Sequence, residues 1–170
     1  MLQRLKKSFE IFIQGQKEKL SNYSFGAISA VITSLALITN LDVGESSKLD
    51  LIRCLCIIAF ADNISDSLSM HIHQESIFSS FRKVWGMTLA NFFARMLVIT
   101  VFIGFIACLP PILAIVSSIL YGFLILIAIS FLVARKRSIR PGRLILEHIL
   151  IATVVLILSK YIAYLIQLRF

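Results

Sequence analysis

Long apolar stretches alternate with short polar segments along most of the chain. Five of these stretches approach or exceed the length of α-helix that crosses the hydrocarbon core of a bilayer, which is about 20 residues. The pattern therefore predicts an all-α integral membrane protein that forms a five-transmembrane-helix bundle. The expected spans cover residues 25–41, 51–71, 87–109, 112–134 and 144–166.

The N-terminal 23 residues have a different pattern. Apolar side chains recur at three- and four-residue spacings from Leu2 to Ile13, and basic residues occupy positions around them. This arrangement is typical of a basic amphipathic helix in the membrane interface, and a solvated basic terminus is the alternative. We expect an amphipathic helix over residues 1–23 and a membrane domain over residues 24–170.

The composition points to the same class of protein. Hydrophobic residues make up 58% of the chain, whereas a soluble domain is about 45–50% apolar. The net charge of +8 does not indicate a nucleic-acid partner, because the basic residues lie between the apolar stretches. They concentrate in the N-terminal segment and in residues 72–86 and 135–143. The positive-inside rule then predicts a cytosolic N-terminus and a C-terminus on the opposite side.

The sequence contains no serine-protease, nucleotide-binding or zinc-hydrolase motif, and we expect neither enzymatic activity nor a permanently bound cofactor. Cys54, Cys56 and Cys108 lie in apolar surroundings. Their odd number and their spacing match neither a disulfide framework nor a zinc site. We therefore expect three small, buried, apolar side chains.

Ionisable side chains interrupt the second expected span. Asp62 and Asp66 are four residues apart and share one helical face, and Met70 follows after four more residues. Charges are expensive in hydrocarbon, so this face must meet protein or a water-filled cavity. Carboxylate and thioether groups here predict a divalent-cation site. Alternatively a basic partner neutralises the aspartates. Arg95 lies at a similar depth in the third span and either pairs with one of them or snorkels to the interface.

Three further polar residues, His71, His73 and Glu75, follow at the end of this span. Neutral imidazole binds first-row metals, which makes these residues candidates for metal capture at the cytosolic mouth. Ordinary interfacial residues are the alternative.

The first span contains small residues at regular intervals. Gly26, Ala30 and Ser34 are spaced by four, a pattern that lets membrane helices approach closely. We expect this helix to pack centrally. Ser29 and Thr33 either line a pathway or hydrogen-bond to their own backbone.

Two stretches resemble the vacuolar iron transporter family. They are GAISAVITSLALITNL at residues 26–41 and ADNISDSLSM at residues 61–70. The resemblance implies a homodimeric transporter that moves ferrous iron or manganese out of the cytosol in exchange for protons. The cation path would run near the first two spans of both subunits. Asp62 would take the place of the second-span acidic ligand, and Met70 that of the methionine ligand.

This chain departs from the family pattern at several positions. Ser29 stands where the family has an aspartate, and Ala30 where it has a glycine. His71 and His73 replace glycines, and the cytosolic metal-binding helices between the second and third spans are missing. Asp66 is one turn from Asp62 and is the candidate substitute for the lost acid. The alternative function is that of a non-transporting membrane protein of the same fold, a structural component or one that binds a partner or lipid.

Overall fold

The apolar stretches fold into long helices in the computed structural model, which describes residues 23–40, 48–78 and 80–169. The expected amphipathic helix over residues 1–23 lies almost entirely outside these ranges. The described residues form no strand, and the expected all-α fold is confirmed. The helices are Tyr23–Asn40 (the first helix), α2 Lys48–Ile57, the π-helix η1 Ile58–Asp62, α3 Asn63–Ile77, α4 Phe81–Cys108, α5 Pro111–Arg137 and α6 Pro141–Gln167.

Proline residues set two of the helix boundaries. Leu109 has an extended backbone, and α5 begins at Pro111. A residue before proline disfavours the helical conformation, and proline itself is accepted in the first helical turn. At the other end of α5, Ser138 adopts a left-handed conformation with φ 55°, and α6 then begins at Pro141.

The connections are shorter than the sequence pattern predicts. Residues 72–86 were expected to form a connection, but α3 continues to Ile77 and α4 begins at Phe81. Residues 135–143 also belong largely to α5 and α6. Polar side chains can continue a helix beyond the hydrocarbon, because they then face water or headgroups. The candidate capture residues of the second span therefore lie within helix α3.

Among the described residues, four helices are long and apolar enough to cross a membrane: Tyr23–Asn40, Phe81–Cys108, Pro111–Arg137 and Pro141–Gln167. The chain is thus a multi-pass membrane protein. The expected second span is a continuous helix made of α2, η1 and α3. At 1.5 Å per residue it is about 45 Å long, enough to cross the core. It is more polar than the others, and its crossing remains a prediction.

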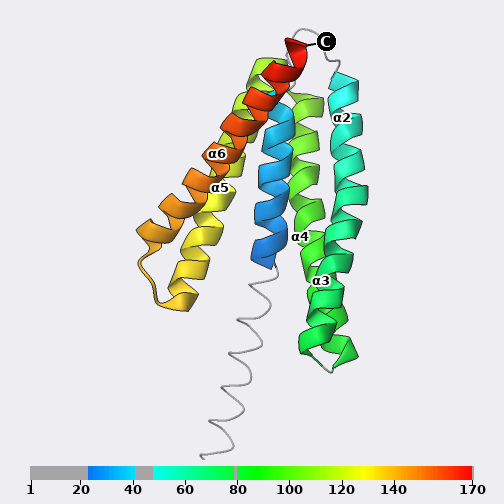
Figure 1. Ribbon diagram of the computed structural model, residues 1–170, viewed down its shortest axis with the longest axis vertical. Helices are drawn as coiled ribbons and strands as arrows, with labels where there is room; N and C mark the ends of the chain where they lie inside the picture. Colours follow the sequence, from blue (N-terminus) through cyan, green and yellow to red (C-terminus); the bar gives the residue numbers. More distant parts are fainter. Residues whose placement is uncertain (1–22, 41–47, 79, 170) are drawn as a thin grey trace, which may run out of the picture.

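Helix α4 connects the two sides of the bundle, because it packs against α2 and α3 as well as against α5. The first helix lies in the middle of the view, with α2 and α3 to one side and the α5–α6 hairpin to the other (Figure 1). The fully buried apolar side chains are shared among these helices. They include Val31, Leu35 and Ile38 of the first helix, Leu55 of α2, Ile99 and Phe102 of α4, and Leu126 of α5.

Two glycines allow the first helix to fit between α4 and α5. A Cβ on Gly26 would lie 2.6 Å from the backbone oxygen of Asn91 in α4. A Cβ on Gly122 of α5 would lie 2.6 Å from Leu35 Cδ1 in the first helix. Ala30 and Ser34 are fully buried on the same helix. The first helix is therefore packed centrally, and backbone contact with its neighbours requires small side chains.

Helix α5 buries a stripe of mostly small residues at four-residue spacing: Ala114, Ser118, Gly122, Leu126, Ser130 and Ala134. Helix α6 is the more peripheral of the two, and Ala152 is its one buried residue within the described chain. The expectation of three buried cysteines was wrong, because Cys54 and Cys108 are exposed and Cys56 is only partly buried. In a membrane, apolar surroundings along the sequence can mean a lipid-facing surface as well as a core.

Candidate ion-binding site

The local structure of the second long helix determines where its acids lie. Buried side chains recur every four residues at Leu51, Leu55, Ala59, Asn63 and Ser67. In a regular α-helix this spacing drifts by about 40° per step. The π-helix η1 has more residues per turn than an α-helix, and this compensates for the drift. The buried stripe therefore continues along the face toward α4.

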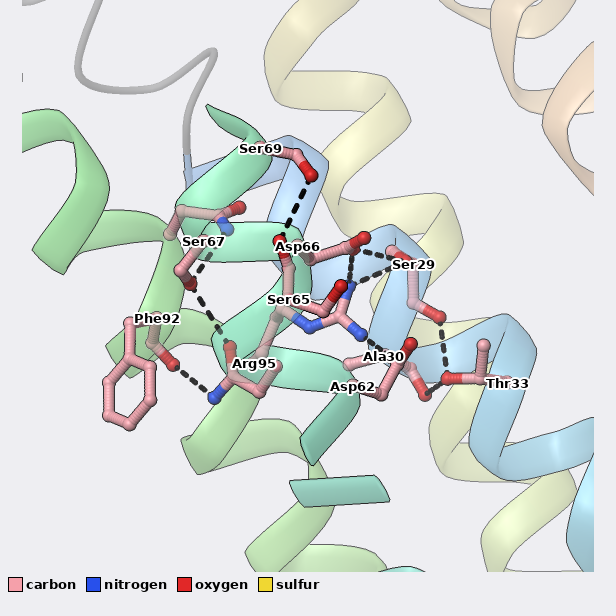
Figure 2. A network of polar contacts seen from close by, with 12 residues as sticks. Ser29, Ala30, Thr33, Asp62, Ser65, Asp66, Ser67, Ser69, Phe92 and Arg95 are labelled. Carbon is pink, nitrogen blue, oxygen red and sulfur yellow. Dashed lines mark hydrogen bonds and ion pairs between the residues drawn. The ribbon is translucent and has the colours of Figure 1, made fainter. Parts of the chain in front are cut away.

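Asp62 and Asp66 each precede a member of this stripe, so they lie at its edge, next to the first helix. Their side chains are 44% and 33% exposed, whereas Asn63 is fully buried. Figure 2 shows both carboxylates directed toward the guanidinium of Arg95, with Ser29 of the first helix beside them. The geometry thus brings together three helices at one polar cluster.

Arg95 pairs with both aspartates, whereas the sequence left open a pair with one of them or a position at the membrane interface. Its Nη1 donates to Asp66 Oδ2 and its Nη2 donates to Asp62 Oδ2. Nη1 also donates to Ser29 Oγ at 2.7 Å, and Ser29 Oγ donates to Asp66 Oδ2 at 3.4 Å. The Arg95 side chain is 0% exposed. The planar guanidinium can engage two carboxylates at once, which a lysine could not do in the same geometry.

The charges of this cluster do not cancel. One guanidinium faces two carboxylates, so with both aspartates ionised the cluster carries one net negative charge. The positive partner is buried, and the two acids are on the accessible side. Inside hydrocarbon an unmatched charge is costly, so in a membrane-spanning helix the surplus carboxylate would need a polar neighbour or water.

A second set of buried polar side chains holds the acids in place. Asn63 Nδ2 donates to the Phe92 carbonyl oxygen at 3.1 Å, and Ser67 Oγ donates to Asn63 Oδ1 at 3.4 Å. Asn91 Nδ2 donates to Ser67 Oγ at 3.4 Å. These bonds join α3 to α4 beside Arg95 (Figure 2). Neither asparagine stands out in the sequence as a site residue, although Asn63 directly follows Asp62 and Asn91 lies one turn before Arg95.

The remaining candidate residues lie farther along α3. Met70 Sδ accepts a hydrogen bond from Gln74 Nε2 at 3.4 Å. His71 Nε2 lies 3.5 Å from Glu75 Oε1, so these two form a pair. His73 is exposed, and its backbone oxygen accepts a hydrogen bond from Ser76. Of the three capture candidates, the fold joins His71 to Glu75 and leaves His73 outside the pair.

In the part of the chain that the structure describes, no group of three or more histidine, cysteine, aspartate or glutamate side chains is arranged to hold a metal ion. The carboxylates of Asp62 and Asp66 instead hold Arg95. A metal at this position would have to displace the guanidinium and take further ligands from hydroxyl groups or water.

Comparison of the chain with protein-family models, with curated proteins and with solved structures finds no match.

Proposed function

We propose that this chain is a divalent-cation transporter, with ferrous iron or manganese as its cargo and Asp62 and Asp66 as ligands of the translocation site. The observation that carries the proposal is the surplus carboxylate beside Arg95. A structural ion pair needs one acid for one guanidinium, and a second acid at membrane depth is typical of a pathway for ions. The resemblance of the first two spans to vacuolar iron transporters supports the same cargo.

In this proposal Arg95 acts as an internal cation that occupies the carboxylates when no metal is bound. An arriving divalent ion displaces the guanidinium, because two carboxylates balance its charge. Ser29 Oγ, now bonded to Arg95 and Asp66, supplies an oxygen beside them. Protons arriving from the opposite side neutralise the carboxylates and release the metal. Arg95 then returns, so that the site is not left with unmatched charge.

The displaced arginine has an acceptor within reach. Asn91 Oδ1 is buried one turn along α4 and has no hydrogen-bond partner among the described residues. Arg95 Nε is likewise buried without a hydrogen-bond partner in the described part of the chain. A small movement of the side chain toward Asn91 would pair both groups. Pairing lowers the cost of moving a buried charge away from its carboxylates.

The test is metal uptake into proteoliposomes, with the homodimer implied by the resemblance checked by the mass of the detergent-solubilised protein. We expect Asp62→Asn and Asp66→Asn to lower the uptake rate by about tenfold or more, because each removes a charged ligand. Asp50→Asn is the matched control, since Asp50 forms an exposed pair with Arg53 at 3.0 Å. Uptake that is unchanged in Asp62→Asn and Asp66→Asn would refute the proposal.

A second function is favoured by a different observation. Arg95 of α4 joins the first helix, through Ser29, to α3, through Asp62 and Asp66. These contacts would hold the three helices in one arrangement. They therefore favour a non-transporting membrane protein that acts as a structural component or binds proteins or lipid. This function predicts that Arg95→Lys, which keeps the charge but loses the planar fork, lowers stability without changing metal permeability. The transporter predicts a changed uptake rate in the same variant.

A further inference from the structure

The α3–α4 pair carries a second polar site, at the end where these two helices connect. His71 Nδ1 lies 2.9 Å from Thr88 Oγ1, and Thr88 Oγ1 donates to the Val84 carbonyl oxygen at 3.0 Å. A threonine hydroxyl has one hydrogen, and the Val84 carbonyl takes it. With the Thr88 hydrogen on the Val84 carbonyl, His71 Nδ1 is the donor to Thr88. In the neutral imidazole, this leaves the lone pair on Nε2.

The Nε2 atom faces a second acceptor. Glu75 Oε1 is 3.5 Å away, which is longer than the 2.7–3.2 Å typical of an N–H···O hydrogen bond. Metal bonds of about 2.0–2.1 Å to imidazole and carboxylate, at a tetrahedral angle, place the two ligand atoms about 3.4 Å apart. The separation is therefore compatible with two ligands around one metal ion as well as with an ion pair.

We propose that His71 Nε2 and Glu75 Oε1 bind a divalent first-row metal ion of the borderline class, such as ferrous iron, cobalt, nickel or zinc, with water in the remaining positions. Imidazole with one carboxylate favours these ions over magnesium and calcium. Thr88 acts as a positioning residue, because its hydroxyl fixes the tautomer and the ring orientation of His71. This is the role that neighbouring acceptors take at metal-bound histidines.

The site is rigid on one side and open on the other. The His71 side chain is 13% exposed, and its ring packs against Trp85 with 4.6 Å between the ring centroids. The Glu75 side chain is 55% exposed, so an ion can reach the pair from solvent. Residues two apart on a helix do not share a face, and His73 therefore lies outside the site.

The pair lies farther along α3 than the aspartates and on a different face of the helix. His71 is five residues beyond Asp66, which is about 7.5 Å along the helix axis and about 140° around it. Metal binding at His71 and Glu75 therefore does not depend on the proposed transport function.

Trp85 makes binding at this site directly measurable. It is the single tryptophan of the chain, and it contacts the proposed ligand His71. We would titrate the full-length protein in detergent with cobalt or nickel and follow tryptophan fluorescence, which these ions quench at short range. The expected result is saturable quenching that His71→Gln abolishes. Glu75→Gln and Thr88→Val should weaken the affinity by about tenfold or more.

Two controls separate this site from the aspartate pair. His73→Gln should leave the quenching curve unchanged, because His73 is exposed and outside the site. The Asp62→Asn/Asp66→Asn double variant should also keep the quenching, even if it abolishes metal uptake. If quenching survives His71→Gln, or the native protein shows no saturable quenching, the pair is an ordinary salt bridge of a protonated histidine and the proposal is overturned. Circular dichroism of each variant checks that the helices are intact.

Discussion

Helices α3 and α4 pack through buried polar side chains, whereas α5 presents a stripe of mostly small residues to its neighbours. The α3–α4 contact contains Asn63, Ser67, Asn91 and Arg95. Between α5 and α6, Ser130 Oγ is 2.7 Å from His148 Nδ1, and the rest of α6 is largely exposed. Both pairs are long helices, yet a guanidinium and two carboxylates meet beside the α3–α4 contact, whereas the Ser130–His148 contact joins a hydroxyl and an imidazole.

This difference contrasts two ways in which the helices of one bundle pack. Lipid is as apolar as leucine, so apolar surface does not drive helices together inside a membrane. Small residues allow close packing, and polar networks fix which helix faces which. The proposed function rests on the network that has a surplus acid. The Ser130–His148 contact between α5 and α6 has no such acid.

The largest expected effect comes from Arg95→Met. Removing one partner of a buried charge pair leaves two carboxylates without a counter-ion, and we expect a loss of about 3–5 kcal/mol in the free energy of unfolding. Arg53→Met is the matched control, because Arg53 pairs with Asp50 on the exposed surface. It should cost about 1 kcal/mol or less. The measurement is unfolding in mixed SDS–detergent micelles, followed by circular dichroism.

The same measurement on Arg95→Met combined with Asp62→Asn and Asp66→Asn tests the reason for that loss. Both charges are then removed along with their partner, so a large part of the stability should return. If the triple variant is as unstable as Arg95→Met alone, packing of the arginine stem and not its charge accounts for the loss.

A smaller effect is expected from Gly26→Ala. The added Cβ would come within 2.6 Å of the Asn91 backbone oxygen, so the helices would have to separate. We expect about 1–3 kcal/mol of destabilisation. Gly104→Ala is the control, because nothing lies within 4 Å of that position. It should be neutral or slightly stabilising, since alanine favours helix over glycine. Equal effects in the two variants would contradict close packing of the first helix on α4.

Ser130→Ala probes the polar contact of the α5–α6 hairpin. The change removes the oxygen that His148 Nδ1 approaches at 2.7 Å. We expect a loss of about 0.5–1.5 kcal/mol, as for one ordinary hydrogen bond. Ser117→Ala in the same helix is the comparison, and it should have a smaller effect. A loss as large as that of Arg95→Met would show that the hairpin, too, depends on a polar network.

The smallest effect is expected on the outer face of α6. Leu158 is 53% exposed, so Leu158→Ala should change the free energy of unfolding by no more than about 0.5 kcal/mol. Chemical crosslinking of the same variant in detergent measures its association. A marked loss of stability together with a loss of crosslinked dimer would mean that this face packs against a second copy and not against lipid.

Apolar runs predicted most of the fold. The all-α class agrees with the structure, and so does the boundary between the expected spans 87–109 and 112–134, because α4 ends at Cys108 and α5 begins at Pro111. The helix ends were less predictable, because α3 and α5 continue through polar residues that the pattern assigned to loops. The stripe of small residues on α5 was present in the sequence but was hidden by the general hydrophobicity of that segment.

The candidate site was only half determined by the sequence. Spacing alone placed Asp62 and Asp66 on one helical face and put Arg95 at a similar depth. It did not decide that one arginine would contact both acids, or that Ser29 would join them from another helix. Those contacts depend on how the π-turn rotates the acids and how closely Gly26 lets the first helix approach α4. The residue spacing within one helix can be read from the sequence. Contacts between side chains of three different helices depend on how those helices pack, so only the tertiary structure could determine them.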